Sequence, residues 1–209
     1  MLRKSSETHP RPDPDRSNLN MNTREIAIAD TRRWLERAVI GLNLCPFAKA
    51  PHAKGQIHYA VSEATDSDAL LQALRGELLA LAEADPEERE TTLLIAPHAF
   101  ADFLEFNDFL DDAETMLDEL GLEGVLQIAS FHPRFQFADT EEDDITNATN
   151  RSPYPTLHLI REESMDRAVD AFPEAEAIFE ANMAKLEELG ASGWEALGVG
   201  PSPEGQVKP

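Results

Sequence analysis

The chain has 209 residues, of which 42% are hydrophobic, and its 40 acidic and 18 basic side chains give a net charge of −22. Such a charge repels phosphate backbones and anionic lipid, which argues against nucleic-acid or membrane-surface binding as the main role. No apolar stretch approaches the roughly 18 residues of a membrane span, and no signal-peptide pattern is found. The single cysteine, Cys45, excludes an internal disulfide, so we expect a cytoplasmic protein.

The ends of the chain differ in composition from the middle. Residues 1–22 are rich in Pro, Ser and charge, and residues 191–209 are rich in Gly, Ser and Pro. Such segments bury too little apolar surface to offset the entropy of ordering. We therefore expect a disordered N-terminal tail, a single globular domain at 23–190 and a flexible C-terminal tail.

The first half of the domain alternates helical and strand patterns. Apolar residues at helical spacing predict a helix at about 23–43, with Asn22 as its N-cap. The β-rich run at 56–63 predicts a strand. Residues 65–68 offer N-caps for a second helix, and the apolar run at 91–97 is typical of a strand covered on both faces.

The second half continues this alternation. A third helix is predicted at about 99–120, followed by strands at 124–131 and 155–162. A last helical region spans about 165–189, with a break at Pro173.

Right-handed crossovers imply that the first three strands run parallel, whereas the fourth can pair either way. The sequence therefore predicts an α/β (or α+β) fold. Its sheet has about four strands, is mostly parallel or mixed, and is packed with helices, and one long polar loop precedes the last strand.

That loop, at roughly 131–155, is long for a compact domain, and such loops are usually functional or disordered. Its aromatic residues favour an ordered loop. It combines a carboxylate run at 139–144 with basic, imidazole and amide side chains. The next strand adds one more imidazole and one more basic side chain. These side chains are His132, Arg134, Asn147, Asn150, Arg151, His158 and Arg161.

The chemistry of these groups suits a bound anion. Arginine presents a planar fork that matches carboxylate or phosphate, and histidine exchanges a proton near neutral pH. We expect an anion-binding pocket at the carboxyl ends of strands. The alternative is that the arginines only neutralise the carboxylates of the loop. The expected ligand-binding residues are Arg134, Asn147, Asn150, Arg151, Ser152 and Arg161.

The candidate catalytic residues are Cys45, His132 and His158. Either histidine could act as general acid or base, and Cys45 could be a nucleophile, a buried structural residue or a metal ligand. Cys45 follows a predicted helix end, where the dipole disfavours a thiolate. The two histidines could bind a metal with a carboxylate of the loop, but their spacing matches no local ligand motif. No metal is assigned, and the cofactor is unknown.

Three motifs resemble a known family. GLNLCPFAKA at 41–50, QIASFHPRFQF at 127–137 and NATNRSPYPTLHLIREES at 147–164 are similar to a bacterial family catalogued only as domain of unknown function 1415. The resemblance covers about 24–190. It implies a common fold and a shared site made from these motifs, and it implies no activity.

Three functions are compatible with these patterns. The first is an enzyme of hydrolase or transferase type that acts on a small anionic metabolite through the Arg, His and Asn side chains. The second is a non-catalytic metal- or ligand-binding protein. The third is a protein-interaction module that uses the loop at 131–155. The patterns do not indicate an oligomeric state.

The acid-rich, lysine-poor composition leads to a first prediction. Because salt screens the repulsion between surface carboxylates, a protein from a salt-adapted host should melt at a higher temperature in molar salt than in low salt. Differential scanning calorimetry at both salt concentrations measures this. An unchanged melting temperature would mean that the charge serves only ordinary solubility.

Overall fold

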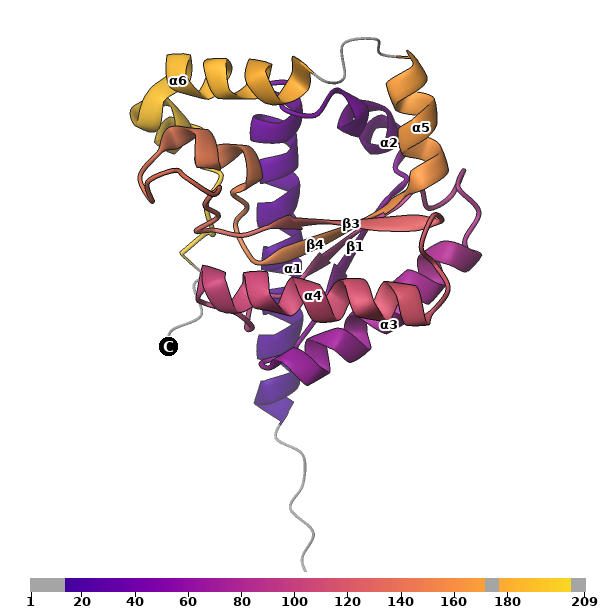
Figure 1. The fold of residues 1–209 in the computed structure, drawn as a ribbon. Helices are drawn as coiled ribbons and strands as arrows, with labels where there is room; N and C mark the ends of the chain where they lie inside the picture. Colours follow the sequence, from indigo (N-terminus) through magenta and orange to yellow (C-terminus); the bar gives the residue numbers. More distant parts are fainter. Residues whose placement is uncertain (1–13, 172–176, 204–209) are drawn as a thin grey trace, which may run out of the picture.

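The computed structural model describes residues 14–171 and 177–203 of the chain. At its centre is a four-stranded mixed sheet with the strand order β1-β2-β4-β3 (Figure 1). The strands are β1 (Ile57–Val61), β2 (Thr91–Ile95), β3 (Leu126–Phe131) and β4 (Thr156–Arg161).

The pairing confirms the predicted α/β fold with a mixed sheet. β1 and β2 are parallel, and β4 is antiparallel to both β2 and β3. The first three strands therefore share one direction, as right-handed crossovers require. The last strand, β4, lies between β2 and β3. The long loop after β3 starts and ends at the same end of the sheet, so β4 runs antiparallel to β3.

The helices flank this sheet. The longest, α1 (Pro14–Trp34), continues through a π-helical turn, η1 (Leu35–Ile40). The others are η2 (Pro46–Ala48), α2 (Lys49–Lys54), α3 (Ser67–Glu83), α4 (Phe103–Glu119), η3 (Ile145–Asn150), α5 (Glu162–Ala171) and α6 (Ile178–Ala196). Within the described residues, none of them has both the length and the hydrophobicity needed to cross a bilayer.

Some boundaries differ from the predicted ones. α1 begins at Pro14, so that Asn22 lies inside a helix and is not its N-cap. The last helical region is two helices, and the break expected at Pro173 lies outside the described residues. α2, η2 and η3 were not predicted, because each is too short to show a periodic pattern.

The lower face of the sheet in Figure 1 is covered by α3 and α4. Asp66 caps α3 by accepting a 2.8 Å hydrogen bond from the backbone N–H of Ala69. The leucine stripe of α3 and the phenylalanines of α4 pack against alternate strand residues, among them Leu94, Leu157 and Leu159. This face therefore holds the main core.

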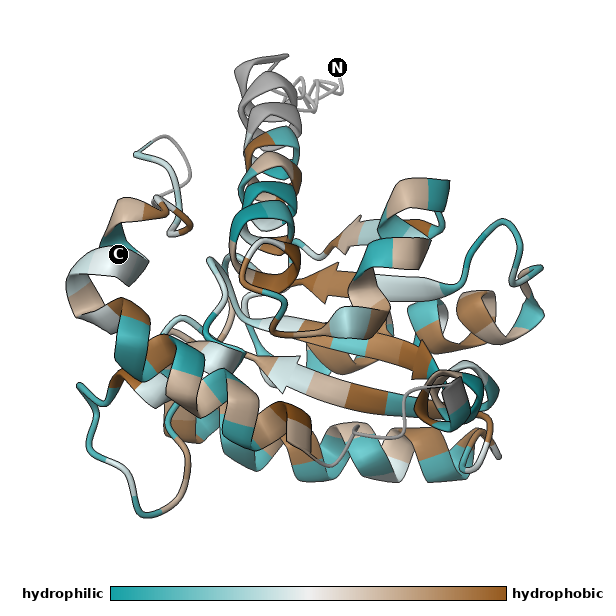
Figure 2. Cartoon of the chain, turned by 90° about the horizontal axis from the view of Figure 1, so that it is seen from above, coloured by the Kyte–Doolittle hydropathy of each residue, from teal (hydrophilic) through white to brown (hydrophobic). Residues whose placement is uncertain are grey.

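The upper face is covered only in part. α1 crosses one end of the strands, where Ala27 packs in a buried cluster with Ile95, and Trp34 meets Phe131 edge-on with ring centroids 5.2 Å apart. Viewed from above, the strands stay in sight between α1 and α5 and carry many hydrophobic residues (Figure 2). Among the helices in residues 14–171 and 177–203, none lies directly on the far end of this face (Figures 1 and 2).

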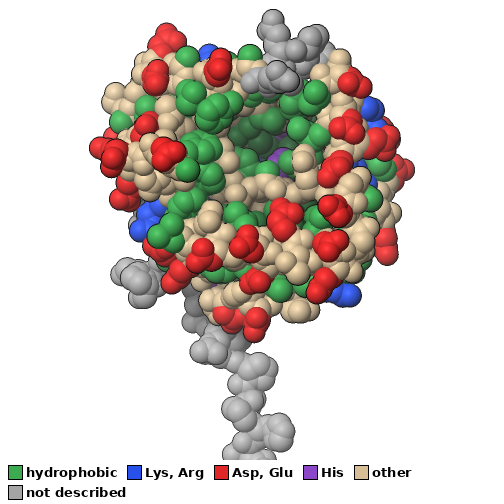
Figure 3. Space-filling model, viewed as in Figure 1, with side chains coloured by type: hydrophobic (Ala, Val, Ile, Leu, Met, Phe, Trp, Pro, Cys, Tyr) green, Lys and Arg blue, Asp and Glu red, His purple; other side chains and the backbone are tan. Residues whose placement is uncertain are grey.

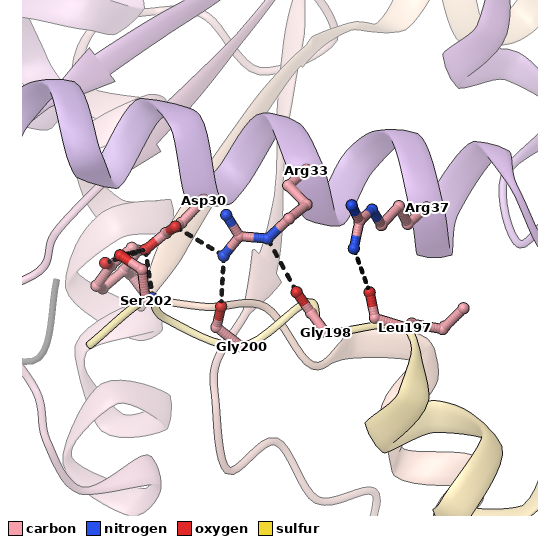
Figure 4. Close-up of polar contacts among 8 residues, drawn as sticks. Asp30, Arg33, Arg37, Leu197, Gly198, Gly200 and Ser202 are labelled. Carbon is pink, nitrogen blue, oxygen red and sulfur yellow. Dashed lines mark hydrogen bonds and ion pairs between the residues drawn. The ribbon is translucent and has the colours of Figure 1, made fainter. Parts of the chain in front are cut away.

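The segment at 197–202 packs along α1, which differs from the flexible tail expected from the sequence. Arg33 donates to the carbonyls of Gly198 and Gly200, both at 2.9 Å, and Arg37 donates to the carbonyl of Leu197 (Figure 4). The buried Val199 joins the hydrophobic cluster at the end of α1. Backbone carbonyls, which any sequence supplies, provide most of this attachment.

A buried carboxylate completes the attachment. Asp30 is 1% exposed and accepts four hydrogen bonds, from Arg33, from the hydroxyl of Tyr154, and from the backbone N–H and hydroxyl of Ser202. Burial and the neighbouring Asp30 raise the pKa of Tyr154, so its hydroxyl keeps the proton that it donates. Asp30 thus joins α1, the start of β4 and the C-terminal segment (Figure 4).

We expect the substitution Asp30→Asn to lower the free energy of unfolding by about 3 kcal/mol, because it leaves the Arg33 charge without its buried partner. Urea denaturation at pH 7 measures the loss. Arg37→Gln is the matched control: it removes an exposed hydrogen bond to a carbonyl and should cost less than about 1 kcal/mol. Equal losses in the two variants would show that Asp30 is not the main link.

Candidate functional site

The uncovered part of the upper sheet face is the first place where a ligand could contact the protein. Strand register places Leu93, His158 and Ala129 side by side across this face, and Thr91, Ile160 and Gln127 form the next row. His158, Ala129, Ile160 and Gln127 are partly exposed. By contrast, Ile95 and Thr156, which lie in the row under α1, are fully buried.

The space-filling view shows a deep hollow at this position (Figure 3). It opens above β3, between α1 and α5, with α2 behind it (Figures 1 and 3). Hydrophobic side chains make up most of its wall, and a histidine is visible at its floor. Large apolar recesses with few polar groups are typical of small-molecule sites.

His158 has a defined tautomer. Its Nε2 lies 2.7 Å from the hydroxyl oxygen of Thr91, and that hydroxyl donates its only hydrogen to the carbonyl of Leu159 at 2.6 Å. Nε2 must therefore donate to Thr91. In a neutral ring this leaves Nδ1 as an acceptor. Nδ1 has no partner within the described residues and is not among their buried unpaired atoms, so it is available to a ligand.

The surroundings keep His158 neutral. Protein atoms enclose most of the ring although part of it stays accessible, and the resulting desolvation lowers its pKa to about 4. Two uncharged residues contact the ring: Thr91, which fixes it, and Phe131, whose ring centroid lies 6.3 Å from that of His158. Neither carries a charge that could offset the lowering of the pKa. His158 is thus a hydrogen-bond acceptor at neutral pH.

Cys45 lies on the same side of the sheet and, like Tyr59 and Phe131, packs against the buried cluster around Trp34. It stands at the N-cap of η2, and its backbone N–H donates at 3.4 Å to the carbonyl of Val39 in the last turn of η1, so the helix end expected from the sequence adjoins it. Hydrogen bonds from the N–H groups of Phe47 and Ala48 favour its thiolate, but burial outweighs them and raises the pKa of Cys45. The thiol is therefore mostly protonated at neutral pH.

His132 lies elsewhere and is structural. It is 1% exposed and stacks on Phe106 of α4, on the other face of the sheet. Its Nδ1 accepts from the backbone N–H of Arg134 at 3.0 Å, and its Nε2 lies 2.9 Å from the carbonyl of Phe100. Both ring nitrogens are occupied, and burial lowers the pKa of His132. The catalytic role expected for it has no geometric support.

The arginines do not meet at one point. Arg134 pairs with Asp102 at 3.1 Å and binds the carbonyl of Ala101, which ties the loop to the start of α4. Arg161, at the far end of β4, donates to carbonyls at the end of α3, those of Leu81 and Ala84, at 2.6 and 2.7 Å. Arg151 lines a pocket with Pro133, Ser152 and Trp194. The anion site expected from all three does not form.

The amides and the serine hold the loop together. Asn147 is fully buried, accepts from the N–H of Phe137 and the hydroxyl of Thr140, and donates to the carbonyl of Glu141. Asn150 donates to the carbonyl of Ser130 at 3.2 Å. The hydroxyl of Ser152 donates to the carbonyl of Tyr154 at 2.6 Å. These contacts explain why the loop is ordered, and they use the groups expected to bind a ligand.

A metal site is not indicated by this geometry. In residues 14–171 and 177–203, no three His, Cys, Asp or Glu side chains are grouped so that they could hold a metal ion. Asp144, one of the loop carboxylates that could have joined the histidines, caps η3 by accepting from the N–H and hydroxyl of Thr146.

Sequence reasoning missed Thr91, Asp30 and Trp194. Asp30 carried a signal, because it sits between Ala27 and Trp34 in the apolar stripe of a helix, where an acid needs a partner. Trp194 carried no signal, because it stands alone in a segment rich in Gly, Ser and Pro. Thr91 carried no signal, since threonine is common in strands.

Comparison with known proteins adds the family. Residues 26–196 match the family described as Protein of unknown function (DUF1415). The chain belongs to this family. No curated protein and no solved structure matches the chain. The matched DUF1415 region contains the whole sheet, Asp30 and His158, whereas the segment at 197–202 follows it.

The low pKa of His158 predicts how stability depends on pH. An unfolded histidine titrates near 6.5, so the unfolded chain takes up a proton before the folded one as the pH falls, and the protein is destabilised between pH 6.5 and 4. The loss from pH 7 to pH 5 is about 2 kcal/mol for this residue. In His158→Phe the free energy of unfolding should fall by about 2 kcal/mol less from pH 7 to pH 5 than in the unmodified protein. Urea denaturation at both pH values measures this difference. An unchanged slope would place the pKa of His158 near its ordinary value.

Proposed function

We propose that the hollow binds a small, mainly apolar molecule that carries an N–H or O–H donor. The supporting observation is that His158, neutral and with Nδ1 unpaired, lies partly exposed on the sheet face above which the hollow opens. Apolar surface left open in the free protein is unfavourable by about 25 cal/mol per Å² relative to burial. A ligand that covers it recovers this free energy, and His158 orients the ligand.

The charge of the protein restricts the ligand. Asp and Glu side chains are spread over the face around the hollow (Figure 3), and the net charge is −22. An anion would be repelled on approach to the hollow, because the neutral His158 offers it no positive charge there, whereas a neutral or cationic molecule would not be repelled. The anionic metabolite expected from the sequence therefore does not suit the hollow.

Binding is favoured over catalysis at this site. A histidine with a pKa near 4 accepts a hydrogen bond at neutral pH but is a weak base for removing a proton. The protonated Cys45 thiol is likewise a weak nucleophile. The hydrolase or transferase hypothesis thus has less support than a ligand-binding role.

The interaction module has less support too. In the loop at 131–155, the side chains of Asn147 and Ser152 donate to the loop's own backbone carbonyls, and that of Asn150 donates to the carbonyl of Ser130 on β3. Few of its polar donors remain to specify a partner.

N-Phenyl-1-naphthylamine, a neutral apolar fluorophore with one N–H, tests the proposal. We expect saturable fluorescence enhancement with one site and a Kd in the micromolar range. Ala129→Phe, which fills the floor beside His158, should weaken binding at least tenfold. His158→Phe, which keeps the ring but removes Nδ1, should weaken it several-fold.

Leu104→Phe is the matched control, since Leu104 is 69% exposed on α4, away from the hollow. It adds an aromatic ring elsewhere and should leave the Kd within twofold. The proposal fails if the probe does not saturate, or if Ala129→Phe binds it as the unmodified protein does.

A further inference from the structure

A second pocket, separate from the hollow, lies between the loop at 131–155 and the C-terminal segment. Its volume is about 190 Å³. Pro133, Arg151 and Ser152 line it from the loop, and Trp194 and Gly200 line it from the opposite side. Sites for drug-sized ligands usually measure ~300–1,000 Å³. This pocket therefore suits a molecule of only a few non-hydrogen atoms.

The C-terminal wall of the pocket is held in place before any ligand arrives. Arg33 fixes the carbonyls of Gly198 and Gly200 at 2.9 Å, and Asp30 fixes Ser202 just beyond them. Trp194 packs against the hydrophobic clusters on α1 and α6. A preformed wall lowers the entropy that a ligand must overcome.

Arg151 brings an unbalanced charge to this pocket. Its Nε donates to the carbonyl of Phe135 at 3.3 Å, and its Nη2 donates to the carbonyl of Glu142. A guanidinium has five N–H groups, so donors remain. Arg33, Arg89, Arg134 and Arg167 each form an ion pair with a carboxylate, but no described carboxylate lies within 4.0 Å of Arg151.

The burial of Arg151 makes this imbalance matter. The side chain is half-buried, and desolvation lowers its pKa despite the more distant charges of Glu142 and Asp144. A partly dehydrated cation with spare donors gains more from a bound anion than an exposed one does.

From this geometry we propose that the pocket binds a small monocarboxylate through Arg151. The planar fork of arginine matches the two oxygens of a carboxylate. Trp194 offers an apolar wall for the body of the molecule. Glu142 and Asp144 are close enough to influence Arg151, so a doubly charged phosphate is repelled more strongly than a single carboxylate. This site does not depend on the hollow.

Benzoate titration by isothermal calorimetry tests this site on the full chain. We expect a Kd of about 1 mM, given the small size of the ligand. The neutral analogue benzamide should not bind at 10 mM. Arg151→Gln should weaken benzoate binding at least tenfold. Arg134→Gln removes a nearby loop arginine outside the pocket and should leave the Kd within twofold.

Several results would overturn the proposal. They are no benzoate binding by the unmodified protein, equal affinity for benzamide, and an unchanged Kd in Arg151→Gln. Phosphate binding as tight as benzoate would overturn the choice of a monocarboxylate. If Arg151→Gln does not fold, Arg151→Lys keeps the charge without the fork and should weaken binding at least threefold. Ala129→Phe, which fills the hollow, should bind benzoate normally, and a loss there would place benzoate in the hollow instead.

Discussion

The architecture depends on one buried negative charge. A carboxylate away from water is stable only if other groups replace its hydration, and Asp30 has Arg33, Tyr154 and Ser202 to do so. These donors come from three segments that are far apart in the chain. The need to satisfy one side chain therefore fixes where α1 lies relative to β4 and to the C-terminal segment. Both candidate sites depend on this arrangement, since α1 borders the hollow and Arg33 holds the C-terminal segment that lines the smaller pocket.

The position of β4 explains why part of the sheet remains open. A strand inserted between β2 and β3 widens the sheet beyond the width that α1 can cover, while α3 and α4 still cover the opposite face. His158 lies on this added strand, one row away from the buried Thr156. The same insertion therefore makes the sheet four strands wide and places a polar ring on its uncovered face.

The sequence predicted the fold better than the sites. Apolar residues at helical spacing marked the helix that runs through α1 and η1, and the apolar run at 91–97 marked β2, because burial leaves a pattern in the sequence. His158 was predicted as a functional residue and lies partly exposed on the upper face of the sheet, and its role stays a prediction. The sequence could not distinguish His132 and Arg161 from His158. Their hydrogen-bond partners are the carbonyls of Phe100 and Leu81, and the residues next to them in the chain do not indicate this. Such contacts with distant backbone leave no trace in composition or spacing.

The π-helical turn η1 has a consequence for how this chain tolerates change in length. It follows the part of α1 that carries Asp30 and Arg33, and it contains the buried Ala38 and Val39. Because an i→i+5 turn holds one residue more than an α-helical turn, a single-residue deletion within η1 is absorbed by conversion to a regular α-helical turn. A deletion in α1 between Arg33 and η1 would instead rotate one half against the other by about 100°. Either the carboxylate would leave Tyr154 or Val39 would leave its cluster. Single-residue gaps in α1 should thus be far less tolerable than gaps within η1.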